Sequence, residues 1–408
     1  MSAPARIEIV YGTRPEAIKT APVVQELRRR SRIQTTVTVT GQHRQIADEV
    51  NAHFGVVPDV DLDLLRPGVS LPELGAAIFT ALAARWSASA PDAVMVQGDT
   101  ATAAVAAVAA HYAGSRVVHL EAGLRSGDLG SPFPEEGNRR LVAAVCSLHL
   151  APTPAARDNL LREGVDAAAI TVTGNTVIDA LHTTFVGPVR FDDPRLERLI
   201  SSDLRVVLVT AHRRESWGAG LAQIAAGILD AISARPDVAV VLPMHPNPAV
   251  RSVLTDVLGA ADRVVLCEPL AYGSFRTVLA RSHVVVTDSG GVQEEAPALG
   301  VPVLVTRERT ERTEAIAAGC ARLIGTRRDR VAAELGALLD DRDRHRAMSH
   351  TANPFGDGRA AERAAAAVEH LLGVGERLPE FRPEVGPRGA HSRRPRERAA
   401  SIAPRLEA

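Results

Sequence analysis

Aromatic residues and lysine are both scarce in this chain. Only 3% of its 408 residues are Phe, Trp or Tyr, while 46% are hydrophobic. The core must therefore be built mainly from Ala, Val, Leu and Ile. Among 47 basic residues, Lys19 is the single lysine. An ammonium kept at one position, where arginine serves everywhere else, indicates that a compact cation is needed there. Chance survival of one lysine in an arginine-biased chain is the alternative.

Long apolar runs and excess charge are also missing. No run reaches the roughly 18 residues of a membrane span, and a net charge of -1 offers no basic surface for nucleic acid or an anionic membrane. The N-terminal MSAPARIEIVYG enters a strand without a signal segment. Cys146, Cys267 and Cys320 lack metal or redox spacing and are expected to be reduced core thiols. A soluble cytoplasmic protein of two to three domains is expected, with neither nucleic acid nor membrane as a partner.

Apolar strand-like segments alternate with helical ones along the chain, which predicts an α/β protein with parallel sheets. We expect a Rossmann-like domain over residues 1–170 and a second over 171–355, with the last helix, about 356–372, a candidate to pack back on the first. Residues 376–408 are rich in Pro, Arg, Gly and Ser, which predicts a disordered tail. Dinucleotide-binding, P-loop and zinc spacings are absent, so we expect no cofactor and no metal.

Residues 283–312, HVVVTDSGGVQEEAPALGVPVLVTRERTER, have the pattern of strand, glycine turn, helix and strand. Gly290 and Gly291 permit a sharp turn, and the helix that follows would direct N–H groups and its positive dipole end at an anion. Arg312 could add a guanidinium to that anion. Glu295 would repel a phosphate unless its carboxylate points toward neutral hydroxyls, such as those of a ribose. An ordinary capped αβ turn is the alternative interpretation.

Three acids stand where predicted strands end or the next helix begins. Asp99 follows DAVMVQ, Glu121 follows RVVHL, and Glu135 opens the helix after SPFP. The carboxyl ends of parallel strands share one edge of the sheet, where open α/β folds bind ligands. A carboxylate at the end of a buried strand is costly unless it is paired or used in chemistry. Helix capping is the alternative role for Asp99.

The segment GTRPEAIK, after the first strand, places two cations at a helix start. Thr13 and Glu16 have capping-box spacing, and Pro15 suits the first turn. Arg14 and Lys19 then lie beside exposed N–H groups, an arrangement that suits a diphosphate. Solvated charges on a helix start are the alternative.

In this order, the motifs of the chain resemble those of the bacterial non-hydrolysing UDP-N-acetylglucosamine 2-epimerases: GTRPEAIK, GQHR, GDTATA, EAGLRSGD, PFPEEGNRRL, GNTVIDAL, AHRRES, MHPN, TDSGGVQEEAPALG and TERTEA. The resemblance covers residues 6 to 372, approximately. It implies a glycogen-phosphorylase-like (GT-B) fold, in which two Rossmann-like domains face a central cleft, and a homodimer. It also implies interconversion of UDP-N-acetylglucosamine and UDP-N-acetylmannosamine, by anti elimination of UDP to 2-acetamidoglucal and re-addition, without a cofactor.

The resemblance also implies roles for individual residues. The acid and base candidates are Asp99, Glu121 and Glu135, with His212 on the diphosphate side. Contacts to the UDP-sugar are implied for Arg14, Lys19, Leu270 and Phe275 (uracil), Ser289, Gly290 and Gly291 (diphosphate), Glu295 (ribose) and Arg312. An allosteric UDP-N-acetylglucosamine site of some members corresponds to Gln42, Gln45, Arg213 and His245.

The chain departs from the family pattern at a few positions. Leu270 stands where some members have Gln, Thr313 where many have Pro, and only Arg66 is near the arginine of the allosteric site. Several alternatives stay open: a hydrolysing epimerase that releases UDP and N-acetylmannosamine, an epimerase for a related UDP-2-acetamido sugar, a retaining glycosyltransferase, and a catalytically silent nucleotide-sugar sensor. A sensor would need Ser289, Glu295 and Arg312 but not the three acids.

Overall fold

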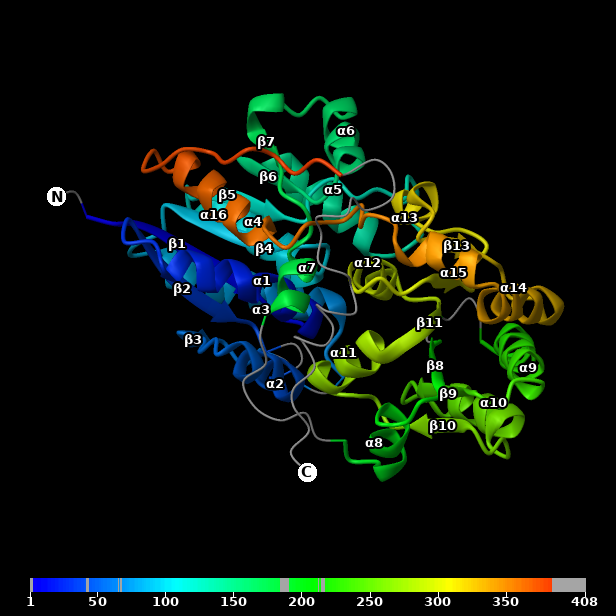
Figure 1. The fold of residues 1–408 in the computed structure, drawn as a ribbon. Helices are drawn as coiled ribbons and strands as arrows, with labels where there is room; N and C mark the ends of the chain where they lie inside the picture. The colour runs from blue at the N-terminus through cyan, green and yellow to red at the C-terminus, as the bar shows by residue number, and fades with distance from the viewer. Residues whose placement is uncertain are drawn as a thin grey trace. The chain divides into compact units, whose positions relative to one another are not determined.

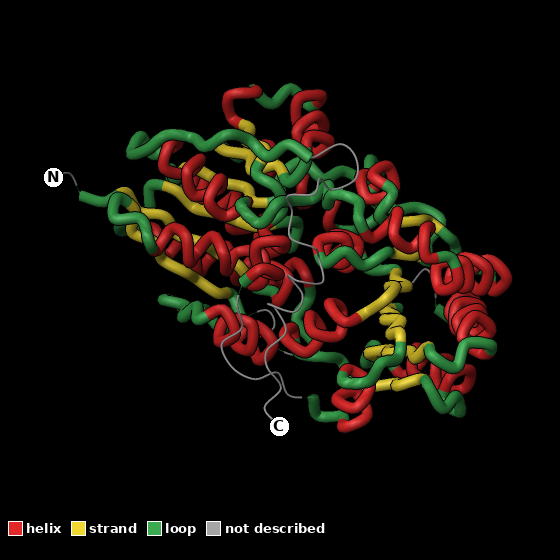
Figure 2. Tube along the Cα trace, in the orientation of Figure 1, coloured by secondary structure: helices red, strands yellow, loops and turns green. Residues whose placement is uncertain are grey.

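The computed structural model describes residues 3–41, 44–64, 66, 68–183, 191–211, 213 and 217–383, without the side chains of 44–48. These residues form two compact units (Figure 1). Met1–Thr183 and Phe355–Pro383 make up the first, and the second lies within Thr184–Pro354. Figure 2 shows helices and strands alternating along both units, as the sequence predicts.

The first unit is built on a seven-stranded parallel sheet in the order β3-β2-β1-β4-β5-β6-β7. Its strands are β1 (Ala5–Tyr11), β2 (Ile33–Val39), β3 (Val60–Asp61), β4 (Ala93–Gln97), β5 (Arg116–Leu120), β6 (Leu148–Ala151) and β7 (Ile170–Val172). The central strand β4 is buried along its whole length, as expected of a parallel sheet covered on both faces.

Helices cover both faces of this sheet. On one face α1, α7 and α16 contact one another, and on the other α4 packs between α3 and α5. The helices are α1 (Arg14–Arg28), α2 (Arg44–Phe54), α3 (Leu71–Trp86), α4 (Ala101–Tyr112), α5 (Glu135–Val145), α6 (Pro154–Arg162), α7 (Thr176–His182) and α16 (Ala360–Leu371), with a 3-10 turn at Ala167–Ala169. In Figure 1 the orange α16 lies alongside the blue α1, far from it in sequence.

Small side chains allow this close packing. Helix α4 buries seven residues against the sheet, all Ala except Thr102, so its backbone approaches the strands closely. Helix α1 begins as its sequence predicts, with a capping box between Thr13 and Glu16. It continues through Pro22 to Arg28 without interruption.

Two expectations for the first unit are wrong. Strand β7 pairs with β6, so residues from 171 to Thr183 belong to the first unit and the boundary falls after the predicted 170. The prediction of disorder is also wrong for residues 376–383. Phe381 is buried, and its N–H donates to the Val172 carbonyl at 2.8 Å. The prediction was based on the low average hydrophobicity of the whole tail, which did not reveal that Phe381 is buried. Residues 384–408 lie outside the described chain.

The second unit holds a six-stranded parallel sheet in the order β10-β9-β8-β11-β12-β13. Its strands are β8 (Arg205–Thr210), β9 (Val238–Pro243), β10 (Val264–Cys267), β11 (Ser282–Thr287), β12 (Val303–Val305) and β13 (Ala321–Leu323). Its core consists almost entirely of Val, Leu, Ile and Ala, as the shortage of aromatics requires.

Helix α9 packs against α10 and α14 on one face of the second sheet, while α11 contacts β8 and β11. The helices are α8 (Pro194–Ile200), α9 (Ala219–Ser233), α10 (Pro248–Leu258), α11 (Tyr272–Arg281), α12 (Gly290–Ala298), α13 (Thr313–Ala318), α14 (Arg328–Asp340) and α15 (Arg342–Ser349). The predicted fold class, α/β with two Rossmann-like parallel sheets, is confirmed. Among the described residues, no helix is both long and apolar enough to cross a membrane.

Candidate active site

In the first sheet, the strand order reverses between β1 and β4, and ligands of open α/β sheets bind at the carboxyl ends of strands beside such a reversal. Glu16 joins the two loops that meet there. Its carboxylate accepts hydrogen bonds from the Gly12 and Thr13 N–H groups at 2.9 and 2.7 Å, and from the Thr100 hydroxyl. Burial raises the pKa of Glu16 despite these bonds.

Glu121 is the most constrained of the three acids. It follows β5 with φ 67°, in the left-handed region that residues other than glycine rarely adopt. Lys19 Nζ lies 2.6 Å from both carboxylate oxygens. The Gln97 amide also donates to Oε2, and the Asn175 amide to Oε1 at 3.3 Å. A buried carboxylate is thus held in a fixed direction by three side chains from different elements.

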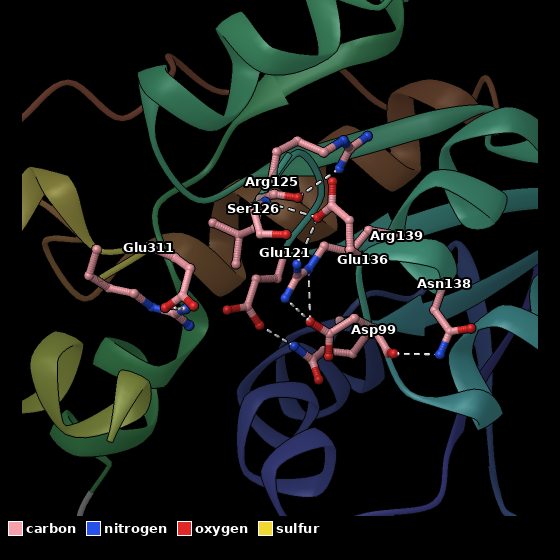
Figure 3. A network of polar contacts seen from close by, with 12 residues as sticks. Asp99, Glu121, Arg125, Ser126, Glu136, Asn138, Arg139 and Glu311 are labelled. Carbon is pink, nitrogen blue, oxygen red and sulfur yellow. Dashed lines mark hydrogen bonds and ion pairs between the residues drawn. The ribbon is translucent and has the colours of Figure 1, made fainter. Parts of the chain in front are cut away.

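Asp99, two residues beyond β4, is paired with Arg139 of α5 (Figure 3). The distances from Oδ2 to Nε and NH2 of Arg139 are 2.9 and 2.6 Å. The Asp99 carbonyl accepts a hydrogen bond from the Asn138 side chain at 2.8 Å. The alternative role of Asp99 as a helix cap is wrong, because Thr100 occupies the N-cap of α4.

Glu135 and Glu136 open α5 but have different surroundings. Glu136 is fully buried and accepts from the Ser126 and Gly127 N–H groups, Arg139 and Arg140. Burial opposes its ionisation, but the bonds from Ser126 and Arg139 outweigh burial and lower the pKa of Glu136. Glu135 buries its Oε2 without a hydrogen-bond partner among the described residues.

In the second sheet, the strand order reverses between β8 and β11. Buried Asp288 follows β11 and accepts from the Arg213 N–H at 2.9 Å, which joins the two loops. Ser289 is the N-cap of α12, yet its hydroxyl makes no capping hydrogen bond. The N–H groups of the first helical turn therefore keep the capacity to bind an anion.

The start of α12 is closed on one side by Arg312. Its Nε donates to Glu294 at 2.9 Å, and a Cβ atom added to Gly290 would lie 3.1 Å from its Cζ. Glycine is needed at 290 because the guanidinium lies against that backbone. Glu295, the next residue of α12, is largely buried.

A second ion pair stabilises the loop before Arg312. Arg307 NH1 lies 3.0 Å from Glu311 Oε2. Burial opposes ionisation of Glu311, but Arg307 and Arg312 dominate and lower its pKa to about 2. Thr310 donates to Gln293 of α12 at 2.7 Å. The loop is thus attached to the helix whose N-terminus Arg312 covers.

The remaining candidates are dispersed within their units. Arg14 is the first residue of α1, half-buried Phe275 lies on α11, and half-buried Leu270 precedes that helix. His245 follows β9, with its ring centroid 6.2 Å from that of Trp217. The predictions for Gln42, His212 and the Gln45 side chain lie outside the described residues.

Four residues that contact Asp99 or Glu121 were not predicted from the sequence: Gln97, Asn138, Arg139 and Asn175. Gln97 is the last residue of β4 and Asn175 caps α7, so each lies at the same sheet edge as Glu121. Gln97 could have been predicted, because it is a polar residue at the end of an otherwise apolar strand. Arg139 carried no such signal, because NRRL has two adjacent arginines and only the fold shows which one is buried. Within the described residues, no group of three or more His, Cys, Asp and Glu side chains is arranged to hold a metal ion.

Comparison with known proteins places the chain in a family. A family model described as UDP-N-acetylglucosamine 2-epimerase matches residues 25–369. The UDP-N-acetylglucosamine 2-epimerase of Escherichia coli (strain K12) is 43% identical over 370 residues, which cover 90% of this chain and 98% of that protein.

Two solved structures have the same fold. The S. aureus MnaA structure with UDP is similar with a TM-score of 0.84 and 39% identity, over 92% of this chain and 100% of that one. The Neisseria meningitidis UDP-GlcNAc 2-epimerase, solved with UDP-GlcNAc bound, is similar with a TM-score of 0.81 and 39% identity. The match covers 90% of this chain and 100% of that one. The fold and its two polar sheet edges are those of the GT-B class of α/β proteins. Within that class, this chain belongs to the UDP-N-acetylglucosamine 2-epimerase family.

Proposed function

We propose that this protein is a non-hydrolysing 2-epimerase that interconverts UDP-N-acetylglucosamine and UDP-N-acetylmannosamine. Family membership supports the substrate, because a relative was solved with UDP-GlcNAc bound. The observation that carries the chemistry is Glu121, a buried carboxylate in a strained conformation whose direction is set by Lys19 and Gln97. Strain of this kind persists where a side chain must point at a reacting atom.

In the reaction we propose, all atoms and electrons are accounted for without an oxidant. A carboxylate of the first unit removes the C2 proton while the bond from C1 to the UDP oxygen breaks on the opposite face, which leaves a C1=C2 double bond in 2-acetamidoglucal. UDP departs with the electron pair. A proton then reaches the other face of C2, and the UDP oxygen adds again to C1. Positioned acids and bases contribute about 10² to 10⁴ in rate to such steps.

We assign roles to residues on the same basis. Asp99, Glu121 and Glu135 are the acid and base candidates, and His212 acts on the diphosphate side. Ser289, Gly290, Gly291 and Arg312 bind the diphosphate, Glu295 the ribose, and Leu270 with Phe275 the uracil, with Arg14 and Lys19 on the nucleotide side. The uncapped start of α12 offers backbone N–H groups, and Arg312 offers a guanidinium cation. Both kinds of group can stabilise the charge that develops on the phosphate oxygens as UDP leaves.

The test is incubation with UDP-N-acetylglucosamine in D₂O. The proposal predicts deuterium at C2 and both epimers still attached to UDP. Free N-acetylmannosamine as the main product would indicate a hydrolysing epimerase. Substrate that binds but stays unchanged would indicate a sensor. Glu121→Gln is expected to lower kcat by about 10² to 10⁴ while UDP affinity in calorimetry stays within a few-fold.

We also propose a cytoplasmic homodimer, whose contact face lies on α3, α4 and α5. The outward positions of α4 carry Ala101, Val105, Val108, His111 and Tyr112, with no Asp, Glu, Lys or Arg among them. Ala101, Val105 and Val108 border an apolar groove together with Leu141 of α5. One face thus offers both a groove and protruding apolar side chains, as a two-fold contact between identical copies requires. Val105→Lys should give a monomer in light scattering, and an unchanged mass would exclude this face.

A further inference from the structure

Two adjacent arginines of α5 share a carboxylate but differ in one contact. Arg139 NH1 lies 3.0 Å from Glu136 Oε2, and Arg140 Nε lies 3.3 Å from Glu136 Oε1. Arg139 also reaches Asp99, at 2.6 and 2.9 Å. The Arg140 side chain is 46% exposed, whereas that of Arg139 is 8% exposed. Helical geometry explains the difference, because successive residues point about 100° apart.

The contact between Arg139 and Asp99 is geometrically restrictive. Nε and NH2 of one guanidinium approach the same carboxylate oxygen, Oδ2, while NH1 is occupied by Glu136. The planar fork therefore has little freedom to turn without breaking a charge-assisted bond. Asn138, the preceding residue of α5, holds the Asp99 carbonyl at 2.8 Å. Consecutive residues of one helix thus hold both the side chain and the backbone of Asp99.

Glu136 extends this arrangement to the loop after Glu121. It accepts from the Ser126 N–H at 2.9 Å and the Gly127 N–H at 3.3 Å, and both belong to the segment EAGLRSGD that Glu121 opens. Figure 3 shows Arg139 between Asp99 and Glu136, with Ser126 beyond them. A continuous set of bonds thus connects one candidate acid to the backbone that follows another.

We propose that Arg139 is a positioning residue of the epimerase: it orients the Asp99 side chain and, through Glu136, keeps Asp99 in register with the loop that carries Glu121. The inference rests on the proposed function, since Asp99 has a task only if that reaction occurs. Arg139 itself does not touch substrate. Its effect passes through Asp99, because the guanidinium fork sets the direction of the Asp99 side chain.

The experiment compares Arg139→Gln with Arg140→Gln, which removes a cation from the same Glu136 without touching Asp99. For Arg139→Gln we expect kcat about 10²-fold lower with KM within a few-fold, because Asp99 loses the planar fork that holds its direction. Arg140→Gln should keep near-wild-type kcat. Arg139→Lys, which retains the charge but not the fork, should recover part of the loss.

A double-mutant cycle with Asp99→Asn separates positioning from folding. If Arg139 acts through Asp99, adding Arg139→Gln to Asp99→Asn lowers kcat little further. Full additivity, or equal kcat for Arg139→Gln and Arg140→Gln, would overturn the inference. Should Arg139→Gln not fold, Arg139→Lys carries the same comparison, with wild-type kcat as the overturning result. A wild-type protein that forms no epimer refutes the proposed function instead.

Discussion

Lys19 Nζ lies 2.6 Å from both carboxylate oxygens of Glu121. The single lysine of the chain is thus placed against the candidate acid with the most strained backbone. Both side chains are largely buried, at 13% and 6% exposure. One ammonium reaches two oxygens from a single point, whereas a guanidinium spreads its donors across a plane. The shape of the cation therefore matters here as much as its charge.

Lys19→Arg should lower kcat by about 10²-fold although the charge is conserved, because the larger planar group displaces Glu121 from its direction. Steady-state kinetics of epimer formation measures this. Arg28→Lys, the opposite exchange in a surface pair with Asp59, should leave kcat unchanged. Wild-type kcat in Lys19→Arg would show that the pair needs only a positive charge.

Gly290→Ala should weaken UDP binding about tenfold or more and lower the unfolding temperature. The new Cβ would meet the Arg312 guanidinium at 3.1 Å and push it from Glu294, at the cost of a charge-assisted bond. Gly291→Ala, whose Cβ meets nothing within 4 Å, should unfold at the wild-type temperature or slightly above, since alanine suits a helix better. Calorimetry and thermal unfolding compare the two, and matching behaviour of both variants would argue against the steric explanation.

Asp179 makes the stability of the first unit dependent on pH. It accepts from the Ala360 and Ala361 N–H groups at 3.1 and 2.8 Å, yet burial raises its pKa from 3.8 to about 6. Between those values the folded state holds the proton and the unfolded state has lost it, so stability falls as pH rises. The full loss, on the order of 3 kcal/mol, is present above the folded pKa.

Asp179→Asn removes that titration. The free energy of unfolding of the variant minus that of the wild type should therefore increase from pH 4 to pH 6 and then level off, as followed by urea unfolding. Exposed Asp158→Asn is the control for the loss of a surface carboxyl group. A flat difference for Asp179→Asn would mean that the carboxyl titrates alike in both states.

Phe381→Ala should lower the free energy of unfolding by about 3 to 5 kcal/mol, because a buried aromatic is lost from beside β7. The ring is 4% exposed, and the Arg363 guanidinium lies 5.8 Å from its centroid. Leu378→Ala, at 36% exposure, should cost less than about 1 kcal/mol. A loss below about 1 kcal/mol for Phe381→Ala in chemical denaturation would mean that the buried ring contributes little to stability.

Local patterns were sufficient for most of the fold. The apolar strands, the capping box at Thr13 and Glu16 and the glycine turn at Gly290 are encoded within a few residues, so the sequence predicts them correctly. Two errors came from long-range packing. Strand β7 belongs to the first sheet because it pairs with the edge of β6. Phe381 is held by a hydrogen bond to Val172, 209 positions earlier. Neither partner is visible in a local window.

For the candidate site, the sequence alone determined which residue types stand at the carboxyl ends of strands. Because parallel strands share that edge, this was enough to select Asp99 and Glu121 as acids. Only the tertiary structure decided which cation each acid receives. Lys19 pairs with Glu121 across 102 residues, and Arg139, rather than Arg140, pairs with Asp99 across 40. The physical reason is that an ion pair depends on direction and burial, which the packing of helices against a sheet sets and the order of residues does not.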